Sequence, residues 1–152
     1  MIQDIYIHLL LAMGLGMVLG VERFIAHKTA GMRTYTLISM GSALFVIISQ
    51  EVAASYSAAA MFDPLRMAAQ IVAAAGFLGV GAIFHTEGRI SGITTASGMW
   101  VAAGIGMACG FGMYPLAILV TILTLFTFIV LWFIEARIRK LDIAHNSEQK
   151  PL

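Results

Sequence analysis

Residues 116-LAILVTILTLFTFIVLWFI-134 are apolar throughout apart from three threonines, and they include no charged side chain. As an α-helix, a stretch of this length crosses the hydrocarbon core of a bilayer, which is about 30 Å thick. Four further apolar stretches precede it, at 5–21, 34–54, 65–84 and 93–113. None of them alternates apolar and polar residues as a membrane-spanning strand does. The pattern predicts an all-α, polytopic membrane helix bundle of five transmembrane helices.

The composition also favours lipid over water as the solvent. Hydrophobic residues make up 60% of the 152 residues and charged ones 11%, whereas a soluble domain carries about 25% charged residues. We therefore expect one transmembrane domain at 1–140, with the lipid bilayer as a partner, and a short polar cytoplasmic tail at 141–152. The formal net charge of +1 gives no indication of nucleic acid, and we expect no nucleic-acid partner.

The basic residues predict an orientation in the cell inner membrane. Every Lys and Arg except Arg66 lies after the first apolar stretch, after the third, or in the tail. Because basic loops are retained in the cytoplasm, the N-terminus is predicted outside and the C-terminus inside. The first residues lack the basic region of a secretory signal, so the first stretch is expected to be a retained span.

Small residues recur at helical spacing and predict close helix contacts, which are the main association force between helices in lipid. Helix 93–113 has small residues on two faces and is expected at the centre. Helix 116–134 is expected at the periphery, with its threonines bonded to its own backbone. A phosphate-binding loop at 76–81 is not favoured, because no strand precedes its glycines. The glycines predicted to pack helices are Gly16, Gly20, Gly76, Gly79, Gly98, Gly106 and Gly110.

A polar trio opens the third helix. Asp63 can cap it and Pro64 suits its first position. Arg66 and Gln70 share one face, and Gln70 is expected to face protein because an amide in hydrocarbon needs a hydrogen-bond partner. Arg66 is expected to reach outward or to pair with Asp63 or Glu51. Two interpretations stay open: a polar site open to the outside, or a helix cap with a structural hydrogen bond.

A second polar group is predicted on the cytoplasmic side. It combines charged residues of the first connection with the start of the fourth helix, where free amides give a partly positive end. The basic side chains can act as a topology signal that touches anionic lipid, or as part of a functional site. The residues are Glu22, Arg23, Lys28, Arg33, Thr94 and Thr95.

Enzymatic chemistry has little support in the sequence. The four histidines are scattered without ligand spacing, and Cys109 is the single cysteine. No nucleophile, base and acid occur in a known catalytic arrangement. We expect no catalytic residue and no enzyme, and we leave the metal-binding residues open, with Mg²⁺ as the one cofactor considered.

Several of these strings together resemble the membrane domain of the MgtC/SapB family, over roughly residues 20–112. Ala74 and Val80 depart from the family pattern, and the short tail stands where many members carry a soluble C-terminal domain. The strings are 20-GVER-23, 30-AGMRT-34, 41-GSA-43, 63-DPLRMAAQIV-72, 76-GFLGVG-81, 92-GITTA-96 and Trp100.

The resemblance implies a bacterial cytoplasmic-membrane protein linked to growth and virulence under magnesium limitation. It also implies regulation of other membrane machinery, such as the proton-driven ATP synthase, although many members are labelled magnesium-transport proteins. The motif residues that would carry over as candidate functional positions are Glu22, Arg23, Arg33, Asp63, Arg66, Gln70, Thr94 and Thr95.

Three functions follow as hypotheses. The first is a regulatory and binding protein that contacts another membrane complex, or copies of itself as a homo-oligomer, through exposed small-residue stripes of the first and fourth helices. The second is an oligomeric magnesium transporter or channel. The third and weakest is a structural, lipid-organising protein.

Overall fold

The computed structural model describes residues 2–55, 63–86 and 89–138, so the predicted tail at 141–152 lies outside it. The helices are α1 (Ile2–Ile25), α2 (Met32–Ser55), α3 (Pro64–Val80), α4 (Ile93–Gly110) and α5 (Tyr114–Phe126). A hairpin of β1 (Phe84–Thr86) and β2 (Arg89–Ser91) separates α3 from α4. A π-helical turn, η1 (Thr127–Leu131), follows α5, and the apolar helix then continues to Ile138.

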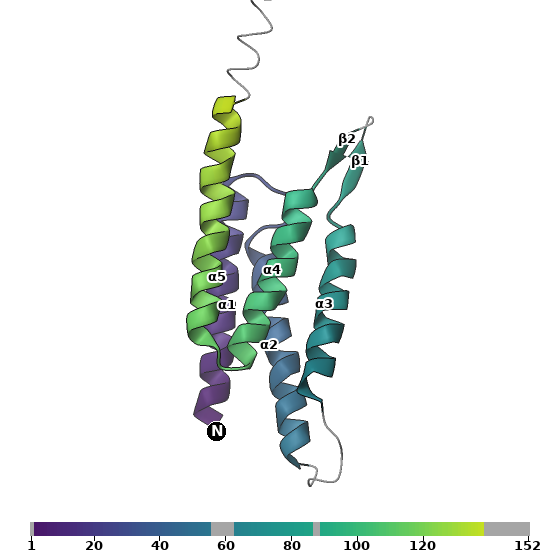
Figure 1. Ribbon diagram of the computed structural model, residues 1–152, viewed down its shortest axis with the longest axis vertical. Coiled ribbons are helices and arrows are strands. Elements are labelled where there is room, and N and C mark those ends of the chain that lie inside the picture. Colours follow the sequence, from purple (N-terminus) through teal and green to yellow (C-terminus); the bar gives the residue numbers. More distant parts are fainter. Residues whose placement is uncertain (1, 56–62, 87–88, 139–152) are drawn as a thin grey trace, which may run out of the picture.

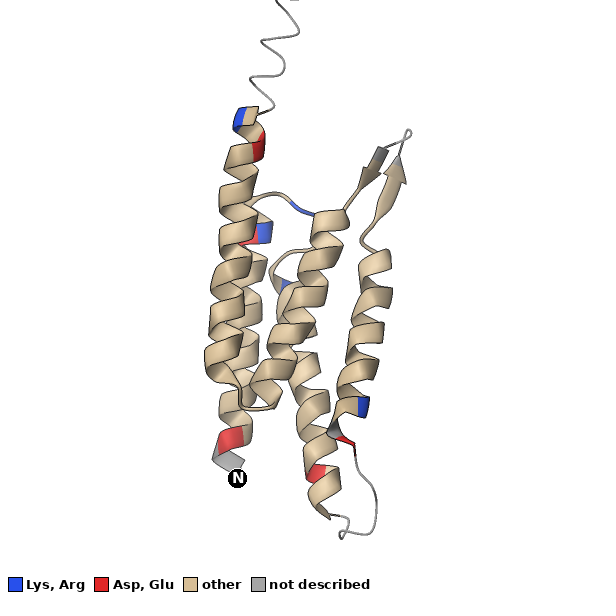
Figure 2. Ribbon diagram, in the orientation of Figure 1, with Lys and Arg blue, Asp and Glu red and all other residues tan. Residues whose placement is uncertain are grey.

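The helices run up and down beside one another (Figure 1). We call one end of the bundle the N-terminal end; it holds the start of α1, the end of α2, the start of α3 and the turn between α4 and α5. The opposite, first-loop end holds the loop 26–31, the hairpin and the end of the last helix. Arg66 is the described basic residue at the N-terminal end, and the other described Lys and Arg lie toward the first-loop end (Figure 2).

Four of the described helices are long and apolar enough to cross a membrane: Asp4–Ile25, Met32–Ser55, Ile93–Gly110 and Tyr114–Ile138. The predicted all-α class is confirmed, but the third of the five predicted spans, 65–84, forms a shorter helix than expected. The helix α3 has 17 residues, which corresponds to about 25 Å at 1.5 Å per residue. It is apolar and extends from the N-terminal end toward the hairpin.

The apolar stretch at 65–84 does not end as a helix, because Val80 is the last residue of α3 and Phe84 pairs with Ser91 in the hairpin. Gly92 then caps α4 with a φ of 91°, in the left-handed region. A Cβ on Gly92 would overlap the carbonyl oxygen of Ala82. The return from hairpin to helix therefore requires glycine.

The central position predicted for the fourth helix is confirmed, since α4 packs against α1, α2, α3 and α5. At the contact with α2, a Cβ on Gly106 would overlap the backbone of Ser39, and one on Gly110 would lie 2.9 Å from the carbonyl oxygen of Ala43. A Cβ on Gly16 of α1 would likewise lie 2.8 Å from the carbonyl oxygen of Tyr35. The backbones of α1, α2 and α4 thus meet directly, as small residues permit.

These contacts contradict the predicted exposure of the small-residue stripes. The stripes of α1 and α4 that were expected to be exposed are largely occupied within the chain, since Gly16, Gly20, Gly106 and Gly110 are buried. Gly20 meets the first turn of α2, and Gly79 lies in ordinary contact with Ala96. Gly76 is exposed and a Cβ there would meet nothing within 4 Å, so it packs against no described neighbour.

The last helix is peripheral and mostly exposed, as predicted. Its threonine hydroxyls donate to carbonyl oxygens four residues earlier: Thr121 to Ala117, Thr124 to Val120 and Thr127 to Leu123. Such bonds satisfy the hydroxyl without a second helix.

Candidate functional site

The side chain of Arg23 is 3% exposed although it lies in the last turn of α1, at the first-loop end. Its guanidinium forms an ion pair with Glu22: Nε donates to Oε2, and Nη2 donates to Oε1 at 2.6 Å. Two parallel bonds of this kind are the strongest that arginine makes with a carboxylate. The C-terminal end of a helix also favours a cation. The buried charge is therefore compensated by its own sequence neighbour.

The second contact of Arg23 is aromatic. Its Cζ atom lies 3.6 Å from the centroid of the Phe128 ring, within the range of a cation–π interaction. Phe128 is buried and belongs to the π-helical turn η1. A single π-helical turn shifts the following residues around the helix axis and is common at functional positions. In η1, Phe128 is the one residue whose side chain is buried in the bundle.

Gly98 of α4 lies against both Phe128 and the side chain of Tyr35 from α2. A Cβ on Gly98 would overlap both the Tyr35 hydroxyl and Cζ of Phe128. The buried Tyr35 hydroxyl donates to the carbonyl oxygen of Thr95 at 3.1 Å. We call the five residues around Gly98 the Arg23 cluster: Glu22, Arg23, Tyr35, Thr95 and Phe128.

The Arg23 cluster connects α1, α2, α4 and η1 at one end of the bundle. Its charges are paired and mostly buried, so the ion pair acts as an electrostatic clamp between these elements. Of the residues predicted on this side, the structure brings together Glu22, Arg23 and Thr95. Arg33 and Thr94 are exposed at the starts of α2 and α4 and lie outside the cluster.

Sequence reasoning missed Tyr35 and Phe128. Phe128 lies in an uninterrupted apolar stretch, where each aromatic residue fits a lipid-facing position equally well. Tyr35 is the easier of the two to single out, because it lies two residues after Arg33 at the start of an apolar helix. Its hydrogen-bond partner Thr95, however, is 60 residues away in the sequence. Neither could be linked to Arg23 without the helix arrangement.

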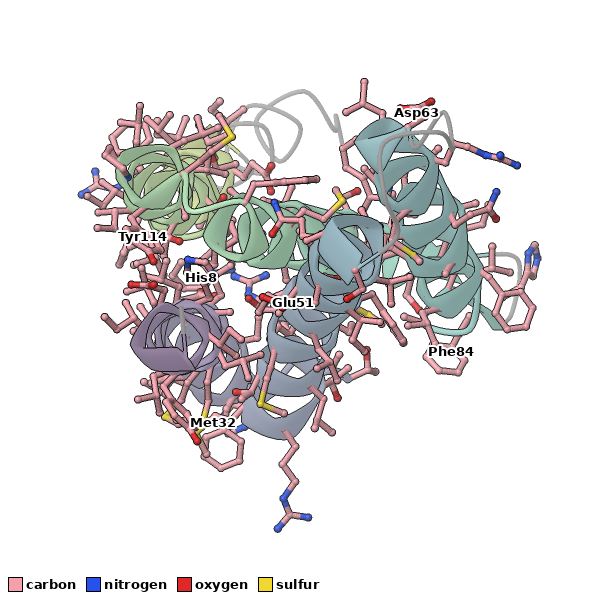
Figure 3. The ribbon with its side chains drawn as sticks, turned by 90° about the horizontal axis from the view of Figure 1, so that it is seen from below. His8, Met32, Glu51, Asp63, Phe84 and Tyr114 are labelled. Atoms are coloured by element: carbon pink, nitrogen blue, oxygen red, sulfur yellow. The ribbon has the colours of Figure 1, made fainter. Side chains whose placement is uncertain are left out.

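The trio at the start of α3 is not gathered into a pocket. Asp63 caps the helix, with its Oδ1 accepting from the amide of Leu65 at 2.9 Å. Arg66 is exposed and forms an ion pair with neither Asp63 nor Glu51, all three of which the structure describes. Viewed from the N-terminal end, Asp63 lies at the rim of the bundle, far from His8 and Tyr114, which face one another (Figure 3).

The expectation that Gln70 faces protein is wrong for the single chain. Its side chain is exposed, whereas Ile71, Ala75 and Gly79 form the buried face of α3. Successive helical residues are about 100° apart, so Gln70 falls beside that face and not within it. Alanines fill much of α3 and gave no indication of which face would be buried.

An apolar groove of about 260 Å³ lies between α3, α4 and α5. Gly104 and Ala108 of α4 belong to its lining, together with Trp100, Met107 and Val120. A Cβ on Gly104 would meet nothing within 4 Å. This second small-residue stripe of α4, unlike the one at Gly106 and Gly110, is thus partly uncovered.

Metal ligands are not grouped in the part of the chain that the structure describes. There, no three His, Cys, Asp or Glu side chains are close enough to hold one ion. The acidic residues at the N-terminal end, Asp4, Glu51 and Asp63, come from three separate elements. The described part of a single copy therefore offers no evident cage for Mg²⁺, which prefers several oxygen ligands in near-octahedral geometry.

Comparison with known proteins settles the family. Residues 9–137 match the MgtC family. The chain belongs to it. The resemblance inferred from the motifs is thereby confirmed, and the apolar helices of this MgtC-family protein fit the predicted multi-pass membrane localisation.

Three relatives illustrate the range of the family. The chain is 41% identical over 127 residues to "Putative magnesium transporter YhiD" of Escherichia coli (strain K12), covering 82% of this chain and 59% of that protein. It is 43% identical over 83 residues to "Protein MgtC" of Brucella abortus (strain 2308), with coverages of 55% and 32%. It is 39% identical over 127 residues to "Protein SrpB" of Synechococcus elongatus, with coverages of 78% and 70%.

The chain aligns with 41% of the length of a similar Haemophilus influenzae protein and 59% of that of the Escherichia coli one. The chain thus spans less than two thirds of the length of these two relatives. No solved structure matches the chain.

Proposed function

We propose that this MgtC-family chain is a non-enzymatic regulatory protein, linked to magnesium limitation, that acts by helix contacts with other membrane machinery. The observation that carries the proposal is the groove at Gly104: an apolar, helix-lined recess with a small-residue floor. In lipid, the association of helices depends on close van der Waals packing, and small residues allow a partner helix to approach closely.

The occupant proposed for the groove is a transmembrane helix of a different membrane protein. The open space above Gly104 admits a side chain from a partner helix. Trp100, which is 51% exposed, borders the same groove and offers a large flat surface to it. The ATP synthase, which the family resemblance brings forward, is one complex with helices of this kind to test.

The packing of the bundle supports contact at the surface over passage through the interior. Gly106 and Gly110 hold α4 against the backbone of α2, and Gly16 holds α1 against it. Direct backbone contact of three helices leaves little room for a hydrated ion between them.

We also propose that the first-loop end lies in the cytoplasm. The basic side chains Lys28 and Arg33 are exposed at that end, which is the arrangement favoured by the positive-inside rule. This orientation places the N-terminal end, with Asp63 and Gln70 near it, on the outer side of the inner membrane.

The test is recovery of partners from native membranes under low magnesium, using mild detergent and the full chain. Gly104→Leu fills the groove without a clash at Cβ, and it should reduce recovery of the partner at least about tenfold if packing there is the main contact. Gly14→Leu is the matched control, because a Cβ on Gly14 of α1 also meets nothing within 4 Å. Equal recovery with both variants would refute the proposal.

An oligomeric magnesium transporter is the alternative. It is favoured by the name of the Escherichia coli relative, a putative magnesium transporter, and by the acidic residues at the N-terminal end, which several copies could bring together. Purified protein in liposomes would then admit Mg²⁺, and Asp63→Asn would lower the rate. Influx no faster than in empty liposomes would remove this alternative.

A further inference from the structure

One face of α3 has no neighbour among the residues that the structure describes. Its residues follow one another at intervals of four and three: Arg66, Gln70, Ala73, Phe77 and Val80. All five are exposed, Phe77 to 81% and Val80 to 69%. The opposite face packs on α2 and α4. We call these five residues the α3 seam.

Gln70 makes this face costly to leave in lipid. It lies six residues into the helix, about 9 Å from its start at 1.5 Å per residue. Its carboxamide has two donor hydrogens and an acceptor oxygen, and none of them bonds to a described residue of the chain. A primary amide in hydrocarbon is stable only when another polar group satisfies it. Since no residue of 2–55, 63–86 or 89–138 supplies that group, a polar partner from a second molecule is favoured.

We propose that a second copy of this chain packs on the α3 seam, about a twofold axis along the membrane normal. A twofold axis brings identical positions together, and a carboxamide is its own complement because it both donates and accepts. The Gln70 amides of the two copies thus satisfy one another. An unrelated apolar helix would leave them unpaired.

The spacing of the seam supports the same occupant. Intervals of four and three residues average 3.5, the repeat of two helices that wind around each other in parallel. Gln70 and Phe77 then occupy equivalent a positions, and a single polar residue at such a position fixes the register of a parallel pair. Ala73 lies between them and permits close approach.

The charges at the start of α3 are also self-complementary. Asp63 and Arg66 are exposed three residues apart and are not paired with each other. Across a twofold axis, Arg66 of one copy can reach Asp63 of the other, and the reverse pair forms at the same time. Opposite charges at one helix start thus become two ion pairs between copies.

The α3 seam and the groove at Gly104 are different surfaces, so this inference does not rest on the proposed function. Val72 borders the groove from α3, but it is not a seam residue. A self-associated pair leaves the groove open to a partner helix.

The test is disulfide trapping in native membranes. Cys109 is the single cysteine and is buried, so Cys109→Ala gives a cysteine-free background. Ala73→Cys and, in a separate variant, Phe77→Cys each place one thiol on the seam. Ile122→Cys is the control, since Ile122 is 57% exposed on α5, away from the seam. Oxidation with copper phenanthroline is followed on a non-reducing gel.

We expect a dimer band from both seam variants and none above background from the control. Adding Gln70→Leu to Ala73→Cys should weaken self-association about fivefold, in line with the modest value of hydrogen bonds between membrane helices. Equal bands at seam and control positions would indicate random collision and would overturn the inference. The absence of a dimer band from both seam variants would also overturn the inference. Neither result would affect the proposed function, which is tested separately by recovery of partners with the unmodified chain.

Discussion

The contact between Gly106 and Ser39 predicts a large difference between two neighbouring glycines of α4. In Gly106→Ala, the new methyl group would overlap the carbonyl oxygen of Ser39 and lie 2.7 Å from its carbonyl carbon and 2.9 Å from its Cα. Ordinary carbon contacts begin near 3.5 Å, so α2 and α4 must separate by at least about 0.8 Å. A gap of that size forfeits a quarter to a half of each contact energy. We expect destabilisation of about 3 kcal/mol.

Gly104→Ala is the matched control, since a Cβ there meets nothing within 4 Å. Both substitutions give the same gain in helix propensity, about 1 kcal/mol, so the control should be unchanged or slightly stabilised. Unfolding in detergent can be followed through the fluorescence of Trp100 and Trp132, or by thermal aggregation. Equal midpoints for the two variants would show that α2 and α4 do not meet at Gly106, and the helix arrangement would then be wrong.

Three further outcomes follow from the Arg23 cluster and the last helix. Arg23→Ala should destabilise the protein by about 2–4 kcal/mol, because it leaves the largely buried Glu22 without its counter-charge; a loss no larger than that of an exposed arginine would contradict the clamp. Tyr35→Phe removes one buried hydrogen bond and should lower the thermal midpoint by an amount equivalent to about 1 kcal/mol; an unchanged midpoint would count against it. Thr124→Val should change the free energy of unfolding by less than about 0.5 kcal/mol, since the hydroxyl bonds to its own helix; a larger loss would imply a contact between helices.

The sequence contained enough to predict the helical class, the peripheral last helix and the central fourth one. These depend on signals that are local or additive: long uncharged stretches, and small residues on two faces of one helix. The start of α3 could also be predicted from the sequence, because Asp63 and Pro64 each have a specific role at a helix N-terminus.

The orientation of α3 could not be predicted in the same way. Membrane helices lack the strong apolar and polar faces of soluble ones, and the alanines at 68–69 and 73–75 fit either side. Gln70 was therefore assigned to the interior by its polarity, whereas packing through Ile71, Ala75 and Gly79 turns it outward. The hairpin was missed for a related reason, since Ile83 and Phe84 extend the apolar stretch beyond the last helical residue, Val80.

Only part of the Arg23 cluster could be predicted from the sequence. The adjacent charges of Glu22 and Arg23 stood out, but a loop position was the simplest place for them. Burial of Arg23 depends on Phe128, which a π-helical turn near the end of the chain brings over the guanidinium. Such a turn arises from packing between distant segments and has no local signature.

Photo-crosslinking from the groove tests the proposed function most directly. A photoreactive amino acid in place of Trp100, which borders the groove, would be activated in membranes of cells starved of magnesium, with position 122 of α5 as the control. We expect an adduct with a second, different membrane protein from position 100 and not from position 122, and we expect this adduct to disappear when Gly104→Leu is added. Adducts with lipid alone, or the same protein adducts from both positions, would contradict it.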